Sequence, residues 1–285
     1  MHEFYSCLHC KRFVCREGWV ALQWPPWTTR TARSTRTPSG QAKPALFFDL
    51  NLQAWTDPPG AFGPPVKRKT GTPRSGDNGR MPNLTLFPTQ VYRAALMPRG
   101  AAAFNRQLLR EARQLRHDDG AGRVWSTTNY PGGYTSYGSA CRMQTVSPTF
   151  ATLEKRLARH VRAFARSLDF DLEGRELAMT DCWVNVMPRG VTHGLHLHPL
   201  STISGTYYVQ VPRGAPGLKF EDPRLDRMMA APPRHRQMRD SNRPWVIVPA
   251  AAGYVVLFES WLRHEVPANT VDSERVSVSF NYAWF

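Results

Sequence analysis

Three histidines in the second half of the chain have the residue type and spacing of a metal site. His196 and His198 are separated by one residue in the segment GLHLHP, and alternate side chains of a strand point to the same face. His264 follows an apolar segment later in the chain. An H-x-H pair alone is as often structural as metal-binding. Imidazole nitrogens are ligands for iron, zinc, copper and nickel, so we predict that the three histidines bind one metal ion.

An arginine and a serine share one face of the last expected strand. Arg275 lies eleven residues after His264 in the segment ERVSVSFN, and Ser277 lies on the same face of the expected strand. The planar, paired donors of arginine match the two oxygens of a carboxylate. The alternative is a surface salt bridge from Arg275 to Asp272 or Glu274, which would contribute well under about 1 kcal/mol.

Two helices and a series of strands must position these residues. Apolar periodicity predicts helices over 101–117 and 148–168, the second capped by Ser147. The Gly- and Tyr-rich stretch between them is expected to be a loop. Its tyrosines would line the substrate pocket or pack over the mouth of the domain; they are Tyr130, Tyr134 and Tyr137.

Strand patterns dominate after residue 171. Seven or so short segments rich in β-branched and aromatic residues follow one another, punctuated by Gly and Pro, with no helical pattern between them. This order favours an antiparallel sandwich or barrel over a parallel sheet. We therefore predict a mainly β fold, a double-stranded β-helix or jelly roll, with two or so supporting N-terminal α-helices.

The first 80 residues differ in composition from the remainder. They are rich in Pro, Gly, Ser, Thr and Arg and lack helical or strand periodicity, which predicts a disordered extension over 1–80 and a jelly-roll domain over 81–285. Natural translation could begin at Met81. The cysteines near the start could bind zinc with a nearby histidine, although their spacing fits no common zinc finger; they are Cys7, Cys10 and Cys15.

Charge and hydropathy bear on partners and location. The net charge is +15, but no dense basic block is interleaved with aromatic residues, so a nucleic-acid partner is not expected. If the basic extension did bind nucleic acid, affinity would fall steeply with salt. No apolar run is long enough to span a membrane, and the start lacks the core of a signal peptide. These features predict a soluble, cytoplasmic protein with reduced cysteines.

The ordered set of motifs resembles that of a known superfamily. H-x-H is followed by SGTYYVQ, by GYVVLFES before His264, and by R-x-S in the last strand. In this order the motifs resemble those of the Fe(II)/2-oxoglutarate oxygenases, and within them a bacterial group of unknown substrate. The resemblance covers about 81–285. It implies an Fe(II)- and 2-oxoglutarate-dependent dioxygenase that uses dioxygen to oxidise a C–H bond of a small-molecule or peptide substrate.

The resemblance also implies roles for individual residues. By analogy with prolyl hydroxylases, Tyr208 in GTYYVQ would bind the cosubstrate, and Arg275 with Ser277 would bind its distal carboxylate. Asn185, on the strand before the H-x-H pair, would orient the cosubstrate or a metal-bound water. A purely structural hydrogen bond is an equal alternative for Asn185.

One position departs from the superfamily pattern, which is H-x-D/E followed by a distant histidine. His198 stands where the carboxylate is expected, and three neutral imidazoles favour later metals such as zinc and copper. Asp222 is a candidate supplementary carboxylate, or else part of a turn or salt bridge. His193 is a spare imidazole that would face away on a regular strand. A cupin-like three-histidine metal protein without 2-oxoglutarate chemistry is the second hypothesis.

The composition break at Met81 leads to a direct test. A protein that starts at Met81 should fold and bind metal as the full chain does, because residues 1–80 carry no apolar periodicity. Circular dichroism and metal content measure both properties. If the shortened protein is insoluble or metal-free while the full chain is neither, the extension is structural.

Overall fold

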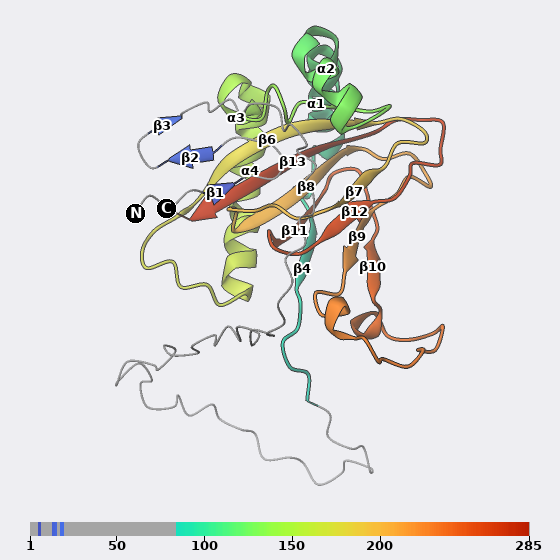
Figure 1. Cartoon of the computed structure of the whole chain (residues 1–285). Coiled ribbons are helices and arrows are strands. Elements are labelled where there is room, and N and C mark those ends of the chain that lie inside the picture. Colours follow the sequence, from blue (N-terminus) through green and yellow to red (C-terminus); the bar gives the residue numbers. More distant parts are fainter. Residues whose placement is uncertain (1–4, 7–12, 16–17, 20–83, 285) are drawn as a thin grey trace, which may run out of the picture. The chain divides into compact units, whose positions relative to one another are not determined.

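The computed structural model describes residues 5–6, 13–15, 18–19 and 84–284 (Figure 1). Near the start, β1 (Tyr5–Ser6), β2 (Phe13–Cys15) and β3 (Gly18–Trp19) form a small antiparallel sheet. Most of the predicted 1–80 extension, including Cys7 and Cys10, lies outside the described residues. None of the described helices is long and apolar enough to cross a membrane.

Two antiparallel sheets form the main part of the fold. The larger has six strands in the order β4-β11-β8-β13-β6-β5, and the smaller has four in the order β10-β9-β12-β7. The strands of the larger sheet are β4 (Val91–Ala95), β5 (Tyr134–Thr135), β6 (Leu177–Met187), β8 (Ile203–Gln210), β11 (Tyr254–Glu259) and β13 (Arg275–Trp284). Those of the smaller are β7 (His193–His196), β9 (Leu218–Glu221), β10 (Trp245–Val248) and β12 (His264–Val266). The predicted mainly β jelly-roll fold is confirmed.

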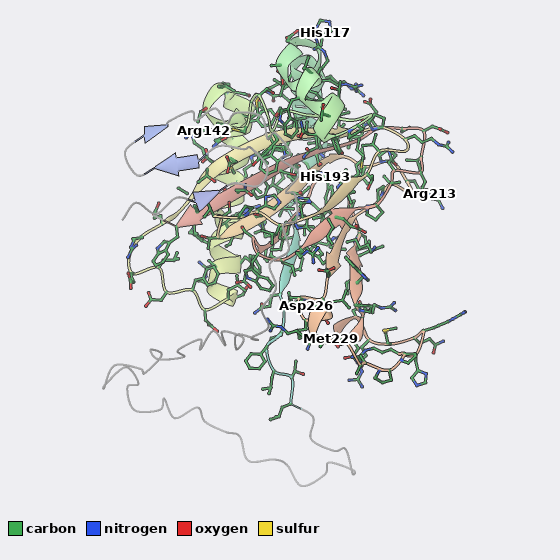
Figure 2. The ribbon with its side chains drawn as sticks, in the orientation of Figure 1. His117, Arg142, His193, Arg213, Asp226 and Met229 are labelled. Carbon is green, nitrogen blue, oxygen red and sulfur yellow. The ribbon has the colours of Figure 1, made fainter. Side chains whose placement is uncertain are left out.

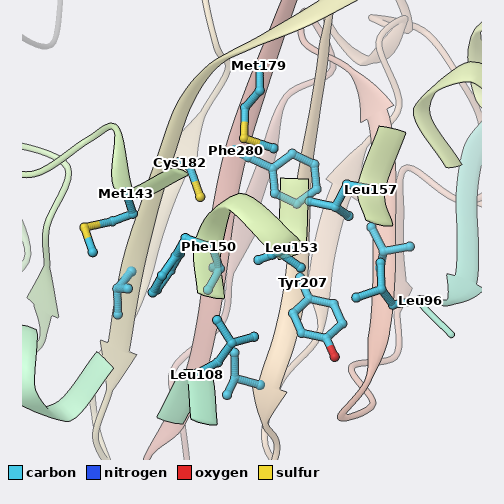
Figure 3. Close-up of a cluster of buried hydrophobic side chains, with 14 of the residues drawn as sticks. Leu96, Leu108, Met143, Phe150, Leu153, Leu157, Met179, Cys182, Tyr207 and Phe280 are labelled. Atoms are coloured by element: carbon cyan, nitrogen blue, oxygen red, sulfur yellow. The ribbon is translucent and has the colours of Figure 1, made fainter. Parts of the chain in front are cut away.

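Helices cover one face of the larger sheet. The two longest are α1 (Ala101–Asp118) and α4 (Pro148–Ser167), each within one residue of its predicted range. The Ser147 hydroxyl accepts hydrogen bonds from the backbone N–H groups of Thr149 and Phe150, so it caps α4 as expected. Leucines of these helices pack against Tyr207 and Phe280 of the sheet in one apolar core (Figure 3).

The stretch expected to be a loop contains more regular structure than predicted. It holds α2 (Gly120–Asn129), the short strand β5 and α3 (Met143–Val146). Asp119 explains the helix, because its carboxylate accepts a 2.8 Å hydrogen bond from the backbone N–H of Gly122 and caps α2. The two glycines in the first turn of α2 concealed the helical pattern. A long segment with 3₁₀ turns at Leu225–Arg227 and Asp240–Asn242 joins β9 to β10 and carries Met229 away from the sheets (Figure 2).

The opposite face of the larger sheet, here called the inner face, meets the smaller sheet. Alternation along β13 directs Val276, Val278 and Phe280 to the helices, so Arg275 and Ser277 lie on the inner face. A second apolar core lies there, with Met187, Tyr208, Phe220, Phe258 and Val266 among its members. The polar side chains of the inner face are therefore enclosed between two apolar layers.

The helix-facing core leads to a stability prediction. Leu157 of α4 is fully buried in it, so Leu157→Ala should lower the free energy of unfolding by about 2–5 kcal/mol. Denaturant unfolding followed by circular dichroism measures this change. Val124→Ala in α2 is the control: its side chain is 72% exposed, and its effect should stay within about 0.5 kcal/mol. Equal effects of the two substitutions would contradict the packing described.

Candidate functional site

The three predicted metal ligands converge between the sheets. His196 ends β7, His264 begins β12, and these two residues are direct partners in the antiparallel pairing. His198 lies just past β7, where its backbone N–H donates to the carbonyl of Ser260 over 2.9 Å. One nitrogen from each of the three imidazoles lies within 4.8 Å of the others. This arrangement has the ligand type and spacing needed to hold one metal ion.

Backbone carbonyls orient two of the rings. His196 Nδ1 lies 2.7 Å from the carbonyl oxygen of Gly194, and His264 Nδ1 lies 2.9 Å from that of Leu262. A proton on each Nδ1 makes these hydrogen bonds and makes Nε2 the candidate metal ligand atom of each ring. Burial, then the neighbouring His196 and His198, hold the pKa of His264 well below its usual range, so His264 is neutral at physiological pH.

His193 lines the same cavity as the three histidines, contrary to the prediction that it would face away. A bulge is the reason. His196 pairs with His264 and His193 pairs with Val266, so three residue steps on β7 match two on β12. The rings of His193 and His196 stack with their centroids 4.6 Å apart. His193 thus supports the ligand group, although it is not one of the three converging imidazoles.

Arg275 is buried beside this group. Its side chain donates to the Ser277 hydroxyl over 3.3 Å, and its guanidinium lies 5.0 Å from the centroid of the Tyr208 ring. The salt bridges weighed as alternatives do not form, because Glu274 pairs with Arg116 and Asp272 pairs with Arg189. Arg275 is only 2% exposed, and among residues 84–284 no carboxylate forms an ion pair with it.

Three buried polar atoms here have no hydrogen-bond partner in the described part of the chain. They are Arg275 Nε, the Tyr208 hydroxyl and Asn185 Oδ1. A buried cation without a counter-charge is costly, and each unmade buried hydrogen bond adds about 1–3 kcal/mol. Native structures leave few such groups unsatisfied. The cluster therefore has the charge and the donors of a site for a carboxylate-bearing ligand.

A small cavity connects the histidines with Arg275. It is lined by the three histidines and also by Arg275, Ser277 and Asn185. The Tyr208 ring lies against the guanidinium of Arg275. Two further polar residues that line it were not predicted, Thr206 and Ser279. Ser279 joins two of the side chains, since it accepts from Asn185 Nδ2 at 3.0 Å and lies 3.1 Å from the Thr206 hydroxyl. Strand alternation from Ser277 and Tyr208 could have indicated both residues.

A second cavity, here called the outer cavity, opens from the same histidines. Trp125 of α2, Tyr137 after β5 and Trp183 of β6 line it, together with Tyr130. Tyr130 and Tyr137 thus line the pocket, one of the two alternatives considered for the tyrosines. Tyr134 takes neither position at the pocket, because it is buried in the core and its hydroxyl donates to Asp119 over 2.9 Å.

Asp222 does not supplement the ligands. Both of its oxygens accept hydrogen bonds from the Arg224 side chain, at 3.0 and 2.9 Å, and these bonds hold the pKa of the carboxyl below its usual value. The segment forms the turn and the salt bridge that were considered as alternatives, with Asp222 paired to Arg224. Within the described residues, the group that could hold a metal contains three histidines and no carboxylate.

Comparison with known proteins gives a match in the segment that holds the site. Residues 181–281, about a third of the chain, match the family model described as "Putative 2OG-Fe(II) oxygenase". No curated protein matches the chain.

Several solved structures are similar to this chain. A 2OG-Fe(II) oxygenase family oxidoreductase from Burkholderia pseudomallei is 22% identical, with 48% of this chain and 59% of that chain covered and a TM-score of 0.36. A prolyl-4-hydroxylase from Pseudomonas putida is 17% identical, with 69% and 94% covered and a TM-score of 0.45. HygX from Streptomyces hygroscopicus, with nickel, 2-oxoglutarate and hygromycin B bound, is 16% identical, with 68% and 83% covered and a TM-score of 0.45. This chain thus covers less than two thirds of the first of these. The resemblance to the 2OG-Fe(II) oxygenases is confirmed by the family match over residues 181–281.

Proposed function

We propose that this protein is a non-haem Fe(II)- and 2-oxoglutarate-dependent oxygenase. His196, His198 and His264 hold the iron, and Arg275 binds the distal carboxylate of 2-oxoglutarate. The observation that carries the proposal is Arg275: a buried cation without an ion-pair partner among residues 84–284, in one cavity with three converging imidazoles. The family match over residues 181–281 supports the same chemistry.

The chain's own groups fit both cofactors. When bound with dioxygen, iron and 2-oxoglutarate supply an oxidative decarboxylation to succinate and carbon dioxide, coupled to oxidation of a substrate C–H bond. Arg275 presents its guanidinium to the far carboxylate, and the Tyr208 and Ser277 hydroxyls can donate to the same oxygens. Asn185 supplies a carbonyl acceptor and is fixed by Ser279. Leu218, Val266 and Phe258 line the same cavity and exclude water from these charged contacts.

The second hypothesis, a cupin-like metal protein, explains less of the site. Three imidazoles would serve it equally well, but it has no use for Arg275 between the apolar layers. With no carboxylate ligand among the described residues, the bound metal keeps one more unit of positive charge, which favours zinc and copper relative to the usual set. The substrate is a small molecule or a peptide.

A cytoplasmic location fits the cysteines that the structure describes. Cys141 and Cys182 are both free thiols. Reduced cysteines are typical of the cytosol. We also propose that the jelly-roll domain spans 81–285 and functions without the first 80 residues.

The histidine triad predicts the effect of removing one ligand. His264→Ala should abolish stoichiometric Fe(II) binding in an anaerobic titration, because two remaining imidazoles cannot hold Fe(II) well against water. His198→Asp restores the usual H-x-D pattern and should retain iron. His117→Ala is the control, since His117 is exposed on α1 and lies outside the group. Full iron occupancy in His264→Ala would rule out this triad.

The anion site predicts a separate effect on the cosubstrate. Arg275→Ala should raise the dissociation constant for 2-oxoglutarate about tenfold to a hundredfold, because a charge-assisted, paired contact contributes about 1.5–3 kcal/mol. Iron affinity should change little. Arg275→Lys should recover only part of the affinity, since an ammonium keeps the charge and loses the fork.

Calorimetry and the visible charge-transfer band of the iron complex measure this binding. Tyr208→Phe removes only the hydroxyl and preserves the ring under Arg275, so this variant should fold normally. A smaller loss of 2-oxoglutarate affinity in this variant would therefore report a lost contact and not a folding defect. Arg189→Ala, an exposed arginine paired with Asp272, is the matched control. Unchanged 2-oxoglutarate binding in Arg275→Ala, or none in the unmodified protein, would refute the proposed function.

A further inference from the structure

The outer cavity differs in chemistry from the cavity that holds Arg275. Among the twelve described residues that line it there is no Asp, Glu, Lys or Arg. A charged group of a ligand that entered this space would lose hydration without gaining a counter-ion, which is costly. The lining of this cavity therefore favours an uncharged group over a charged one.

Aromatic rings form a continuous wall on one side of the outer cavity. The Trp183 ring lies 5.8 Å from that of His198, the Tyr137 ring 5.0 Å from that of Trp183, and the Trp125 ring 6.1 Å from that of Tyr137. Each distance joins ring centroids in the range of aromatic contacts. The wall thus runs from the candidate metal ligands to α2, and its neighbouring rings are inclined by 31° to 62°, so it offers both ring faces and ring edges to a flat molecule.

Polar side chains of the outer cavity already have hydrogen bonds within the protein. Asn281 accepts from the Ser204 hydroxyl and donates to Asp181, and Asn129 donates to the carbonyl of Trp125. Thr135 accepts from a backbone N–H. These bonds reduce the hydrogen-bonding capacity that Asn281, Asn129 and Thr135 offer to a ligand with many hydroxyls, such as a sugar, so the ring surface contributes more to recognition.

Two glycines make room for this wall. A Cβ on Gly138 would lie 2.4 Å from the Trp125 ring, and a Cβ on Gly133 would lie 2.4 Å from the Tyr130 ring. Real Cβ atoms do not approach a ring so closely, so each ring rests directly on a glycine backbone. Asp119 holds the same region, because it accepts hydrogen bonds from Gly122, Tyr134 and Ser139. The outer cavity is therefore a built feature of the fold.

We propose that the outer cavity binds an uncharged, flat ring system, and that a C–H bond at the edge of that ring is the one presented to the histidine site. This assignment of substrate class rests on the proposed oxygenase function. The rings of Trp125, Tyr137 and Trp183 bind the face of the molecule, while the cosubstrate occupies the separate cavity at Arg275.

The test uses the full-length protein loaded anaerobically with Fe(II) and saturating 2-oxoglutarate. Calorimetric titrations compare 2-naphthol with 2-naphthoate, with 2-naphthylmethylammonium and with methyl glucoside. We expect 2-naphthol to bind at least about tenfold more tightly than each of the other three. Saturating 2-oxoglutarate prevents the carboxylate of 2-naphthoate from binding at Arg275. Equal binding of the three naphthalenes, or a preference for methyl glucoside, would overturn the proposal.

Variants locate the binding. Gly138→Ala displaces the Trp125 ring and should weaken 2-naphthol binding at least about fivefold, and Trp125→Leu should do the same by removing the ring. Gly120→Ala is the matched control, because its Cβ would meet only Arg123 at 3.8 Å. Wild-type affinity in both ring variants would overturn the assignment to this cavity.

The charge-transfer band in the same samples distinguishes failure of the proposed oxygenase function from failure of the proposed substrate class. A normal band without a preference for 2-naphthol would refute the proposed substrate class and support the oxygenase function. A missing band with the preference for 2-naphthol intact would refute the oxygenase function and support the ring-binding cavity.

Discussion

The site depends on the pairing of β13 with both β6 and β8. This ten-residue strand places Val276, Val278 and Phe280 in the helix-facing core, and the same alternation puts Arg275 and Ser277 on the inner face. A shift of one residue in the register would exchange the two sets and bury a guanidinium among the helices. The apolar core thus fixes where the cation lies, and only the fully packed sandwich makes the anion site.

Sequence patterns predicted those features whose geometry follows from local periodicity. The helices Ala101–Asp118 and Pro148–Ser167 carry a clear apolar stripe and a cap, and Arg275 with Ser277 follows strand alternation. The position of His193 could not be predicted, because it depends on a bulge opposite His264 that no composition signal marks. Helix α2 was missed because its N-cap residue, Asp119, is also the C-cap residue of α1, and because glycines follow it.

Glycines in the stretch between α2 and α3 serve packing more than chain flexibility. Their sequence signature resembles an irregular loop, yet Gly133 and Gly138 are positions where an aromatic ring lies against the backbone. A glycine of a flexible loop and a glycine that accommodates a ring are distinguished only by the structure, which shows which ring lies over which residue. The part of the pocket wall that Trp125 forms therefore remains hidden until the structure places its ring on Gly138.

If Arg275 binds a carboxylate as proposed, its unmatched charge would also couple the stability of the fold to the concentration of that ligand. Any ligand that binds only the folded state stabilises it by about 2.7 kcal/mol at a concentration one hundred times its dissociation constant. A carboxylate ligand at Arg275 would also remove the penalty of a lone buried cation, which the unfolded chain does not bear. The lifetime of the protein in the cell would then rise and fall with the supply of the proposed cosubstrate, independently of turnover.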